Sequence, residues 1–385
     1  MTHTVRGIGG FRAARWLMSS GALVSVLVAS TAHAQALPAQ VTADTTLTLA
    51  GSPYVISGDV EVMPGVTLTI EPGTVLEFQT GPDQPTGWFP GFAELIVDGT
   101  LVADGPTSAP VTFEGTTPGI AHWGGLMFTS GAAASLGNAT VTDAIVGIRQ
   151  LAYPASTLAL DHVNVWNCNA GVHATYGDLT LDSSTIHDNF YGVINIGTAS
   201  VALSNLVVYN NSVTGIDLEG SVASTIINST LDNNGLGITA SGPVSVKNSI
   251  ISGGSSAISG SSVTVTYSDI WGEPVSPYAS GVGCMALDPL FVGTGDYHLQ
   301  AGSPVIDAGD AAGAPSHDRD DVARPLDGDG DGSAEWDLGA YEAPAVMSCP
   351  DGDDNCDCDE HHHHRHHGHD HDGHDHDHDH GHGHG

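Results

Sequence analysis

The last 25 residues of the chain have the plainest capacity for chemistry in this sequence. Residues 361–385 contain 14 His and 5 Asp, and the alternation of His with Asp and Gly differs from the uninterrupted run of a purification tag. Neutral imidazole is a common protein ligand for Zn²⁺, Cu²⁺ and Ni²⁺. The sequence therefore predicts a tail that binds a transition metal (Zn, Cu or Ni). The predicted ligands are His361, His362, His363, His364, His366, His367, His369, His371, His374, His376, His378, His380, His382 and His384.

Residues 347–385, which include this tail, are predicted to be disordered. They contain too few apolar side chains to offset the loss of chain entropy on folding. Cys349 and Cys356 are a candidate disulfide for an oxidising compartment. Alternatively, Cys356 and Cys358 are thiolates that join the imidazoles as metal ligands. A solubilising end with no physiological metal is the other interpretation of the tail.

An acidic loop before the tail carries a second set of possible ligands. Carboxylates alternate with Gly at 327–332, which is how a loop surrounds Ca²⁺ with oxygen atoms. Leu338 stands where an EF-hand loop has its bidentate Glu, so the match is incomplete. An acidic turn paired with Arg319 or Arg324 is the alternative. The predicted calcium ligands are Asp327, Asp329, Asp331 and Glu335.

The first 34 residues have the three parts of an export signal. Arg6, Arg12 and Arg15 precede a short apolar run, and Ala32 and Ala34 form a small-x-small cleavage pattern. The apolar run is short for a membrane span, which needs about 20 residues. We therefore expect a Sec-type signal peptide at 1–34, a secreted or periplasmic mature chain, and no integral membrane segment after its removal.

The charge of the mature chain excludes several classes of partner. Residues 1–34 hold three of the eight Lys and Arg residues and no acidic residue, so five basic residues remain against 44 acidic ones. Such a surface repels nucleic acid and anionic lipid, and it disfavours anionic polysaccharides. We therefore expect no nucleic-acid partner. Charged residues are only 14% of the chain and Gly is abundant, which favours a folded β protein.

A repeat of about 22 residues organises the middle of the chain. The segments 169–177, 189–197, 211–220 and 234–242 align, each opening with Asn and running into a short alternating strand. One repeat cannot bury its own apolar side chains, so the repeats are expected to stack as coils of a solenoid. Asn169, Asn189, Asn211 and Asn234 are expected to stack at one turn, with Asn in the left-handed conformation. The predicted inward columns are Val172, Val193, Ile216, Ile238 and Ile258; Leu160, Leu181, Leu203, Ile226, Val246 and Val265; and Val165, Ile186, Val208, Leu231, Ile251 and Ile270.

These coils resemble the right-handed parallel β-helix proteins of the pectate-lyase-like superfamily. The segments 58–78, 93–115 and 122–128 match the pattern of early coils, and 288–310 with 337–342 resembles the C-terminal region of exported bacterial "choice-of-anchor Q" proteins. The resemblance implies an all-β, single-domain right-handed parallel β-helix. We expect an N-terminal cap and first coils at 35–128, the repeats at 129–285, the C-terminal signature region at 286–346 and the tail at 347–385.

The outward residues of one strand column are the candidates for catalysis. His173, Asp217 and Glu219 would lie on one face, although His173 and Asp217 are two coils apart, or about 10 Å. Two carboxylates at i and i+2 form a solvated face as readily as a glycosidase pair. Tyr176, Tyr191 and Tyr209 are possible sugar-stacking residues, or packing residues at turns and edges.

The sequence thus favours an exported, non-catalytic β-helix whose tail binds metal ions, for sequestration or for docking to an envelope protein. The alternative is a β-helix that binds or cleaves a neutral or weakly charged glycan, such as one on a cell surface. If the chain is an enzyme, the expected activity is that of a glycan hydrolase or lyase.

Overall fold

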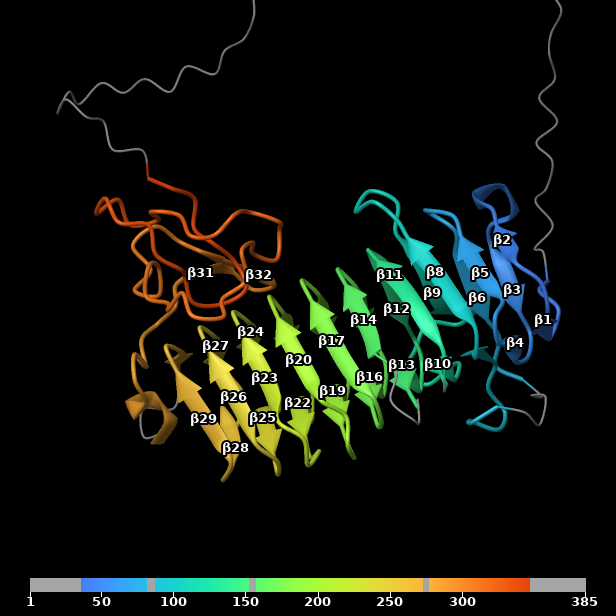
Figure 1. Ribbon diagram of the computed structural model, residues 1–385, viewed down its shortest axis with the longest axis horizontal. Coiled ribbons are helices and arrows are strands. Elements are labelled where there is room, and N and C mark those ends of the chain that lie inside the picture. Colours follow the sequence, from blue (N-terminus) through green and yellow to red (C-terminus); the bar gives the residue numbers. More distant parts are fainter. Residues whose placement is uncertain (1–35, 82–86, 130, 152–156, 273–276, 347–385) are drawn as a thin grey trace, which may run out of the picture.

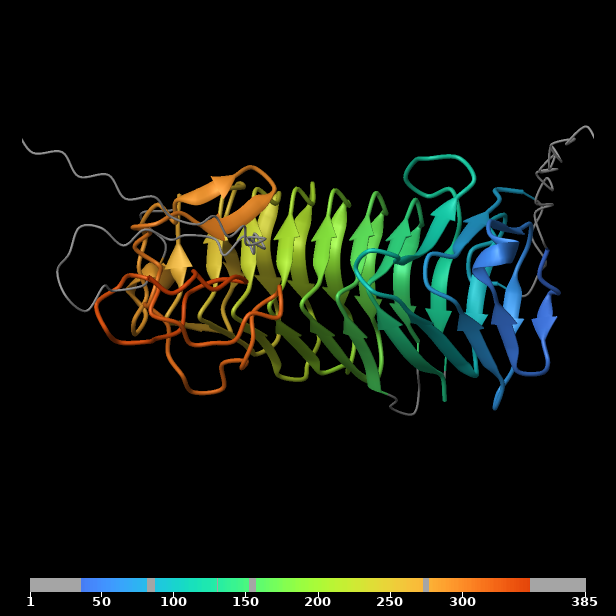
Figure 2. The same cartoon turned by 90° about the horizontal axis from the view of Figure 1, so that it is seen from above.

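The structure is a computed structural model, and it describes residues 36–81, 87–129, 131–151, 157–272 and 277–346. Each turn of the chain contributes one strand to each of three parallel sheets, and each sheet has ten strands. Figures 1 and 2 show the resulting elongated spiral, blue at its N-terminal end and orange at its C-terminal end. No helix in the described ranges has the length and apolar character needed to cross a membrane.

The three sheets are named in the order in which the chain enters them. Sheet 1 contains β1 (Gln40–Val41), β4 (Val60–Val62), β7 (Glu94–Val97), β10 (Gly125–Phe128), β13 (Val146–Gln150), β16 (Ala170–Ala174), β19 (Tyr191–Asn195), β22 (Thr214–Leu218), β25 (Leu236–Ala240) and β28 (Ile258–Gly260). Sheet 2 contains β2 (Thr45–Leu47), β5 (Thr67–Ile70), β8 (Thr100–Asp104), β11 (Ala133–Gly137), β14 (Thr157–Asp161), β17 (Asp178–Asp182), β20 (Val201–Ser204), β23 (Ser224–Ile227), β26 (Val244–Lys247) and β29 (Val263–Thr266). Sheet 3 contains β3 (Tyr54–Ile56), β6 (Val75–Phe78), β9 (Val111–Gly115), β12 (Ala139–Thr142), β15 (Asn164–Trp166), β18 (Thr185–His187), β21 (Val207–Tyr209), β24 (Thr230–Asp232), β27 (Ile250–Ser252) and β30 (Asp269–Ile270).

The predicted inward columns are confirmed by the strand register. Val172 pairs with Val193, which pairs with Ile216, and the other two columns continue in the same way along sheets 2 and 3. These aliphatic side chains form one continuous buried cluster. Full burial of each Val, Leu or Ile is worth about 1.5–3 kcal/mol, so stacking makes the coils stable together.

The expected Asn ladder is present, but its first position is corrected. Asn189, Asn211 and Asn234 are buried, and each side-chain oxygen accepts the backbone N–H of the ladder residue one coil earlier. Cys168, which is also fully buried, occupies the first rung, whereas Asn169 is exposed. The sequence alignment therefore placed this coil one residue too late.

The left-handed residues of this turn directly precede the ladder. Asn167, Asp188, Asn210 and Asn233 have φ between 51° and 55°, whereas the ladder Asn residues do not have positive φ. Asn and Asp tolerate this conformation better than other residues with a side chain. One residue thus turns the chain, and the next one satisfies buried backbone groups.

A second turn, between sheets 2 and 3, also contains left-handed Asn residues. Asn205, Asn228 and Asn248 have φ of 53°, 45° and 48°. Their side-chain amides point away from the spiral and donate to the backbone carbonyls of His317 (3.2 Å) and of Asp337 and Asp310 (3.0 and 2.9 Å). This row of amides attaches residues 286–346, called the C-terminal region below, to three successive coils.

The C-terminal region follows one short helix at the end of the spiral. The 3-10 helix η2 (Pro277–Ser280) packs Tyr278 against the end of the core, as the 3-10 helix η1 (Leu49–Gly51) lies near the other end. The hairpin β31 (Phe291–Gly293) and β32 (Asp296–Leu299) then begins the C-terminal region. Figures 1 and 2 show this region, orange to red, folded back beside the last coils.

Candidate functional site

A groove of about 350 Å³ lies where the C-terminal region meets the outer face of sheet 3. This volume is within the range of small-molecule binding sites. The groove crosses the strands from β12 to β21, with residues of the β8–β9 connection at one end. Its lining side chains are Thr107, Pro110, Asn138, Ala139, Thr140, His162, Asn164, Thr185, His187, Tyr209 and Arg319.

Sheet 3 supplies two outward columns to this groove. Thr140, Asn164 and Thr185 are register partners on β12, β15 and β18, so their polar side chains repeat along the face. His187 and Tyr209 belong to the neighbouring column, two residues further along each strand. Alternation along a strand sends these side chains outward while the residues between them fill the core.

Three rings form a stack along the second column. Trp166 lies parallel to His187 with ring centroids 6.1 Å apart, and His187 lies parallel to Tyr209 at 4.8 Å. His187 and Tyr209 line the groove, whereas Trp166 lies behind them in the stack and is not among the lining residues. Burial raises the pKa of the Tyr209 phenol, and the carboxylate of Asp188 raises it further. Tyr209 therefore offers a neutral hydroxyl.

Both nitrogens of His187 have partners that fix the ring. Nδ1 lies 2.6 Å from a carboxylate oxygen of Asp188, and Nε2 lies 3.1 Å from the side-chain oxygen of Asn164. The ring cannot rotate without breaking both contacts. The groove thus presents a pre-positioned imidazole edge beside the Asn164 amide.

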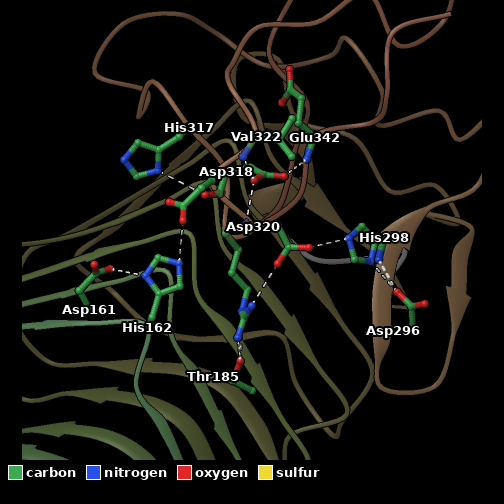
Figure 3. A network of polar contacts seen from close by, with 12 residues as sticks. Asp161, His162, Thr185, Asp296, His298, His317, Asp318, Asp320, Val322 and Glu342 are labelled. Carbon is green, nitrogen blue, oxygen red and sulfur yellow. Dashed lines mark hydrogen bonds and ion pairs between the residues drawn. The ribbon is translucent and has the colours of Figure 1, made fainter. Parts of the chain in front are cut away.

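Arg319 forms the wall on the side of the C-terminal region. Its Nε and Nη2 both donate to the hydroxyl of Thr185, at 3.1 and 2.6 Å, and Nη1 donates to Asp320 at 3.2 Å. Thr185, which accepts these two hydrogen bonds, is labelled on the spiral in Figure 3. A residue 134 positions away in sequence therefore completes the groove.

Two histidines beside this wall each contact two carboxylates. His162 lies between Asp161 (2.9 Å) and Asp321 (3.7 Å). His298 of β32 lies between Asp296 (2.7 Å) and the same Asp320 that pairs with Arg319 (3.1 Å), as Figure 3 shows. The hydrogen bond from His298 lowers the pKa of Asp296. Asp320 thus links the groove wall to the β31–β32 hairpin.

A buried carboxylate holds the wall segment in shape. The Asp318 side chain accepts the backbone N–H groups of Asp320 and Val322, both at 2.8 Å, and of Glu342 at 2.9 Å. Arg319 also donates its backbone N–H to the carbonyl of Ala340 at 2.9 Å. The wall is therefore anchored within the C-terminal region as well as to the spiral.

Beneath the wall lies a buried ion pair. Arg324 Nε is 3.2 Å from a carboxylate oxygen of Glu342, and both side chains are fully buried. Burial raises the pKa of Glu342 to about 7, with Asp337 adding to the rise and Arg324 opposing it. Burial likewise raises the pKa of Asp337 to about 6.

These two carboxyls predict how stability depends on pH. Each folded-state pKa is raised, so the folded chain binds protons more tightly than the unfolded chain, where the values are near 4. These two groups are therefore expected to raise the free energy of unfolding as pH falls from about 8 to about 5, by up to about 1.4 kcal/mol per pH unit for each. His173, whose folded-state pKa is lowered to about 4, opposes this rise below about pH 6.5. Urea unfolding at pH 8, 7, 6 and 5 measures this. Glu342→Gln is expected to flatten the dependence, and an unchanged slope in that variant would contradict the assignment.

The catalytic candidates from the sequence lie on sheet 1, away from this groove. His173 is half-buried, and burial together with Arg149 lowers its pKa to about 4. Ile194 stands between His173 and Asp217 in the register, so the two residues are separated by a strand. The Asp217 carboxylate accepts the hydroxyl of Thr239 at 2.6 Å. The structure does not bring His173, Asp217 and Glu219 together in the described contacts.

The neighbours of His173 include contacts that could not be predicted from the sequence. Arg149 is its register partner, and its guanidinium lies 5.9 and 5.6 Å from the ring centroids of Trp88 and Phe89. The Glu94 carboxylate accepts the backbone N–H groups of those two aromatic residues, and burial raises its pKa. These contacts fasten a loop over sheet 1.

The acidic loop is only partly assembled as the sequence predicts. Carboxylate oxygens of Asp327, Asp329 and Asp307 lie within 4.8 Å of one another. Asp307, which is 20 residues earlier in the chain, is an addition, and Asp331 and Glu335 are not in this group. Asp307 also accepts the backbone N–H groups of residues 328, 329 and 335. Calcium binding here stays a prediction.

The metal and disulfide predictions for the tail lie outside the described residues. These are the His residues from 361 to 384 and the pair Cys349 and Cys356. The two cysteines within the described ranges, Cys168 and Cys284, are free thiols. Burial raises the pKa of Cys168 to about 12, so this thiol is a packing residue.

Of the three Tyr residues considered for sugar stacking, the groove contains Tyr209. Tyr191 is on sheet 1, and Tyr176 follows β16. The outward positions of sheet 3 lie one residue on either side of the predicted inward column of Val165 and Ile186, and reading them is the signal that would have revealed Asn164 and His187. No sequence signal brings Arg319 to Thr185, because their contact depends on how the C-terminal region folds back.

Comparison with known proteins supports the architecture. Residues 122–284, less than half of the chain, match a family model described as "Right handed beta helix region". No curated protein matches the chain. The crystal structure of pectate lyase Pel9A is similar with a TM-score of 0.47 and 14% identity, covering 80% of this chain and 85% of that chain. Together with the three stacked parallel sheets, the family match identifies an all-β right-handed parallel β-helix.

Proposed function

We propose that the protein binds a neutral glycan in the groove between sheet 3 and the C-terminal region. The observation that supports this proposal is the lining of the groove, which combines uncharged hydroxyls and amides with the rings of His187 and Tyr209. Sugar hydroxyls both donate and accept hydrogen bonds, and Asn, Thr, Tyr and His side chains can do the same. Arg319 is paired with Asp320, and the carboxylates of Asp161, Asp188 and Asp321 lie beside the lining histidines, so the groove does not attract an anionic ligand.

The surrounding charge favours a neutral ligand over an acidic one. The chain as a whole has a formal charge of −36, which repels anionic polymers at a distance. A neutral glycan escapes this repulsion. The proposal thus keeps the glycan alternative from the sequence and moves it from sheet 1 to sheet 3.

We propose binding without cleavage. The described side chains that line the groove include no Asp or Glu, whereas glycoside hydrolysis ordinarily requires a pair of carboxylates. The imidazole of His187 is already held by Asp188 and Asn164. With the export signal expected at 1–34, the partner would be a glycan outside the cytoplasm.

Truncation of the groove side chains is expected to weaken glycan binding. Asn164→Ala and His187→Ala each remove hydrogen-bonding groups worth about 1–2 kcal/mol, which corresponds to a loss of affinity of about five- to thirtyfold. Titration calorimetry of the full chain against a glucan, a mannan, a galactan and a xylan measures the effect. Thr225→Ala on the exposed face of sheet 2 is the matched control. Equal affinities for the wild type and both groove variants would rule out this site.

The His/Asp tail supports a second, independent proposal. Alternating His and Asp residues at 361–385 provide many alternative sets of three or four ligands for Zn²⁺, Cu²⁺ or Ni²⁺. Uptake is expected to decline as pH falls through about 6.5, where imidazoles become protonated. Metal titration of the full chain and of a chain ending at residue 348 tests this, because equal uptake by both excludes the tail.

A further inference from the structure

We infer that the groove recognises the end of a glycan chain, or a short oligosaccharide, and excludes the interior of a polymer. This inference rests on the proposed function and adds the form of the ligand. A β-helix face repeats its strands at about 4.8 Å, so by itself it offers an open trough along the spiral axis. Whether a polymer can lie along that trough depends on what covers each end.

The C-terminal region covers the trough from β21 onward. The backbone N–H of Ala340 donates to the Thr230 hydroxyl of β24 at 3.0 Å. Ala340 and Tyr297 pack on Val207 of β21. Leu338 packs on Ile250 of β27. The outward positions that would continue the groove are therefore occupied by protein.

The boundary between open and covered strands is Arg319 on Thr185. Tyr209, the last ring of the stack, is itself covered by Tyr297, whose ring centroid is 5.4 Å away. A glycan that lies over Asn164 and Thr185 therefore meets a guanidinium and a phenol edge at this side. Because Arg319 is held at both its side chain and its backbone, the wall does not depend on one weak contact.

The opposite side of the groove is bounded as well. Thr107 and Pro110, from the connection between β8 and β9, line it beside Thr140 of β12. The space between the two boundaries is about 350 Å³, at the small end of the range for ligand sites. A few sugar rings fill such a space, and a continuing chain has to leave it outward.

The test compares intact and partly hydrolysed samples of the same polysaccharide. Mild acid hydrolysis that shortens the mean chain length about fivefold raises the number of chain ends per gram about fivefold. The sugar and the linkage stay the same. If the groove takes ends, the amount of full-length protein bound per gram at saturation is expected to rise by the same factor. Equilibrium dialysis against the glucan, mannan, galactan and xylan measures it.

Each outcome separates the inference from the proposed function. If the protein binds and hydrolysis does not change the amount bound per gram of polysaccharide, glycan binding is retained and end recognition is overturned. If the wild-type protein binds none of the four polysaccharides and none of their hydrolysates, both the proposed glycan binding and the recognition of chain ends are overturned. The wild-type comparison requires no variant to fold.

Removing the wall gives an independent readout. Arg319→Ala removes the guanidinium at the boundary, whereas Ala340 and Tyr297 still cover the strands beyond it. The variant is therefore expected to bind chain ends about tenfold more weakly and to keep the fivefold advantage of the hydrolysate. Arg149→Ala removes the same charge from sheet 1 and is expected to keep the wild-type affinity. An Arg319→Ala protein with the wild-type melting temperature and the wild-type affinity would exclude Arg319 as the boundary.

Discussion

Replacing Arg324 with Met is expected to release the C-terminal region from the spiral. The substitution leaves the fully buried carboxylate of Glu342 without its cation, next to Asp337 and Asp318. Loss of one partner of a buried ion pair typically lowers the free energy of unfolding by about 3–5 kcal/mol. Limited proteolysis combined with urea unfolding measures this, and cleavage is expected to begin within residues 286–346.

The matched control removes both charges. Arg324→Met with Glu342→Leu replaces the pair with apolar side chains of similar size, and such replacements are often nearly neutral. We therefore expect the double variant to recover much of the lost stability. A single variant as resistant to protease as the wild type would show that the pair does not hold the region in place.

Asn211→Ala is expected to destabilise the spiral at its centre. The Asn211 side-chain oxygen accepts both the backbone and the side-chain N–H of Asn189, at 3.1 and 3.0 Å. Its Nδ2 donates to the carbonyl of Ile186 at 3.0 Å. Each buried group left without a partner costs about 1–3 kcal/mol, so we expect a loss of about 2–4 kcal/mol.

The neighbouring Ser212→Ala is the control for this prediction. Ser212 is exposed in the same turn, so its replacement is expected to change stability by less than about 0.5 kcal/mol. Denaturant midpoints of the two variants provide the comparison. Equal midpoints would mean that the ladder amides contribute no more than surface residues do.

The spiral itself could be predicted from sequence because its rules are local and repeated. Val172, Val193 and Ile216 recur at the same place in successive coils, and a column of that kind is visible without any structure. The shift from Asn169 to Cys168 shows the limit of this approach. An alignment of Asn residues cannot tell a left-handed turn residue from the buried ladder residue that follows it.

The candidate site was much less predictable, because it depends on contacts between distant segments. From sequence alone, the outward column of sheet 1 offers the clearest candidates for catalysis, His173 and Asp217. The groove instead combines the uncharged residues Asn164 and Thr185 with Arg319. Folding back of the C-terminal region determines that contact, and its amide partners on the spiral, such as Asn228, look in sequence like ordinary turn residues.

The attachment of the C-terminal region to individual coils means that the number of open coils determines the length of the groove. Asn205, Asn228 and Asn248 each hold it to a coil later than the open strands β12, β15 and β18. Duplication of one coil among those open strands would therefore move the two boundaries apart by about 4.8 Å while leaving both intact. Gain or loss of a single repeat would thus lengthen or shorten the groove by one strand spacing without any new contact at its walls.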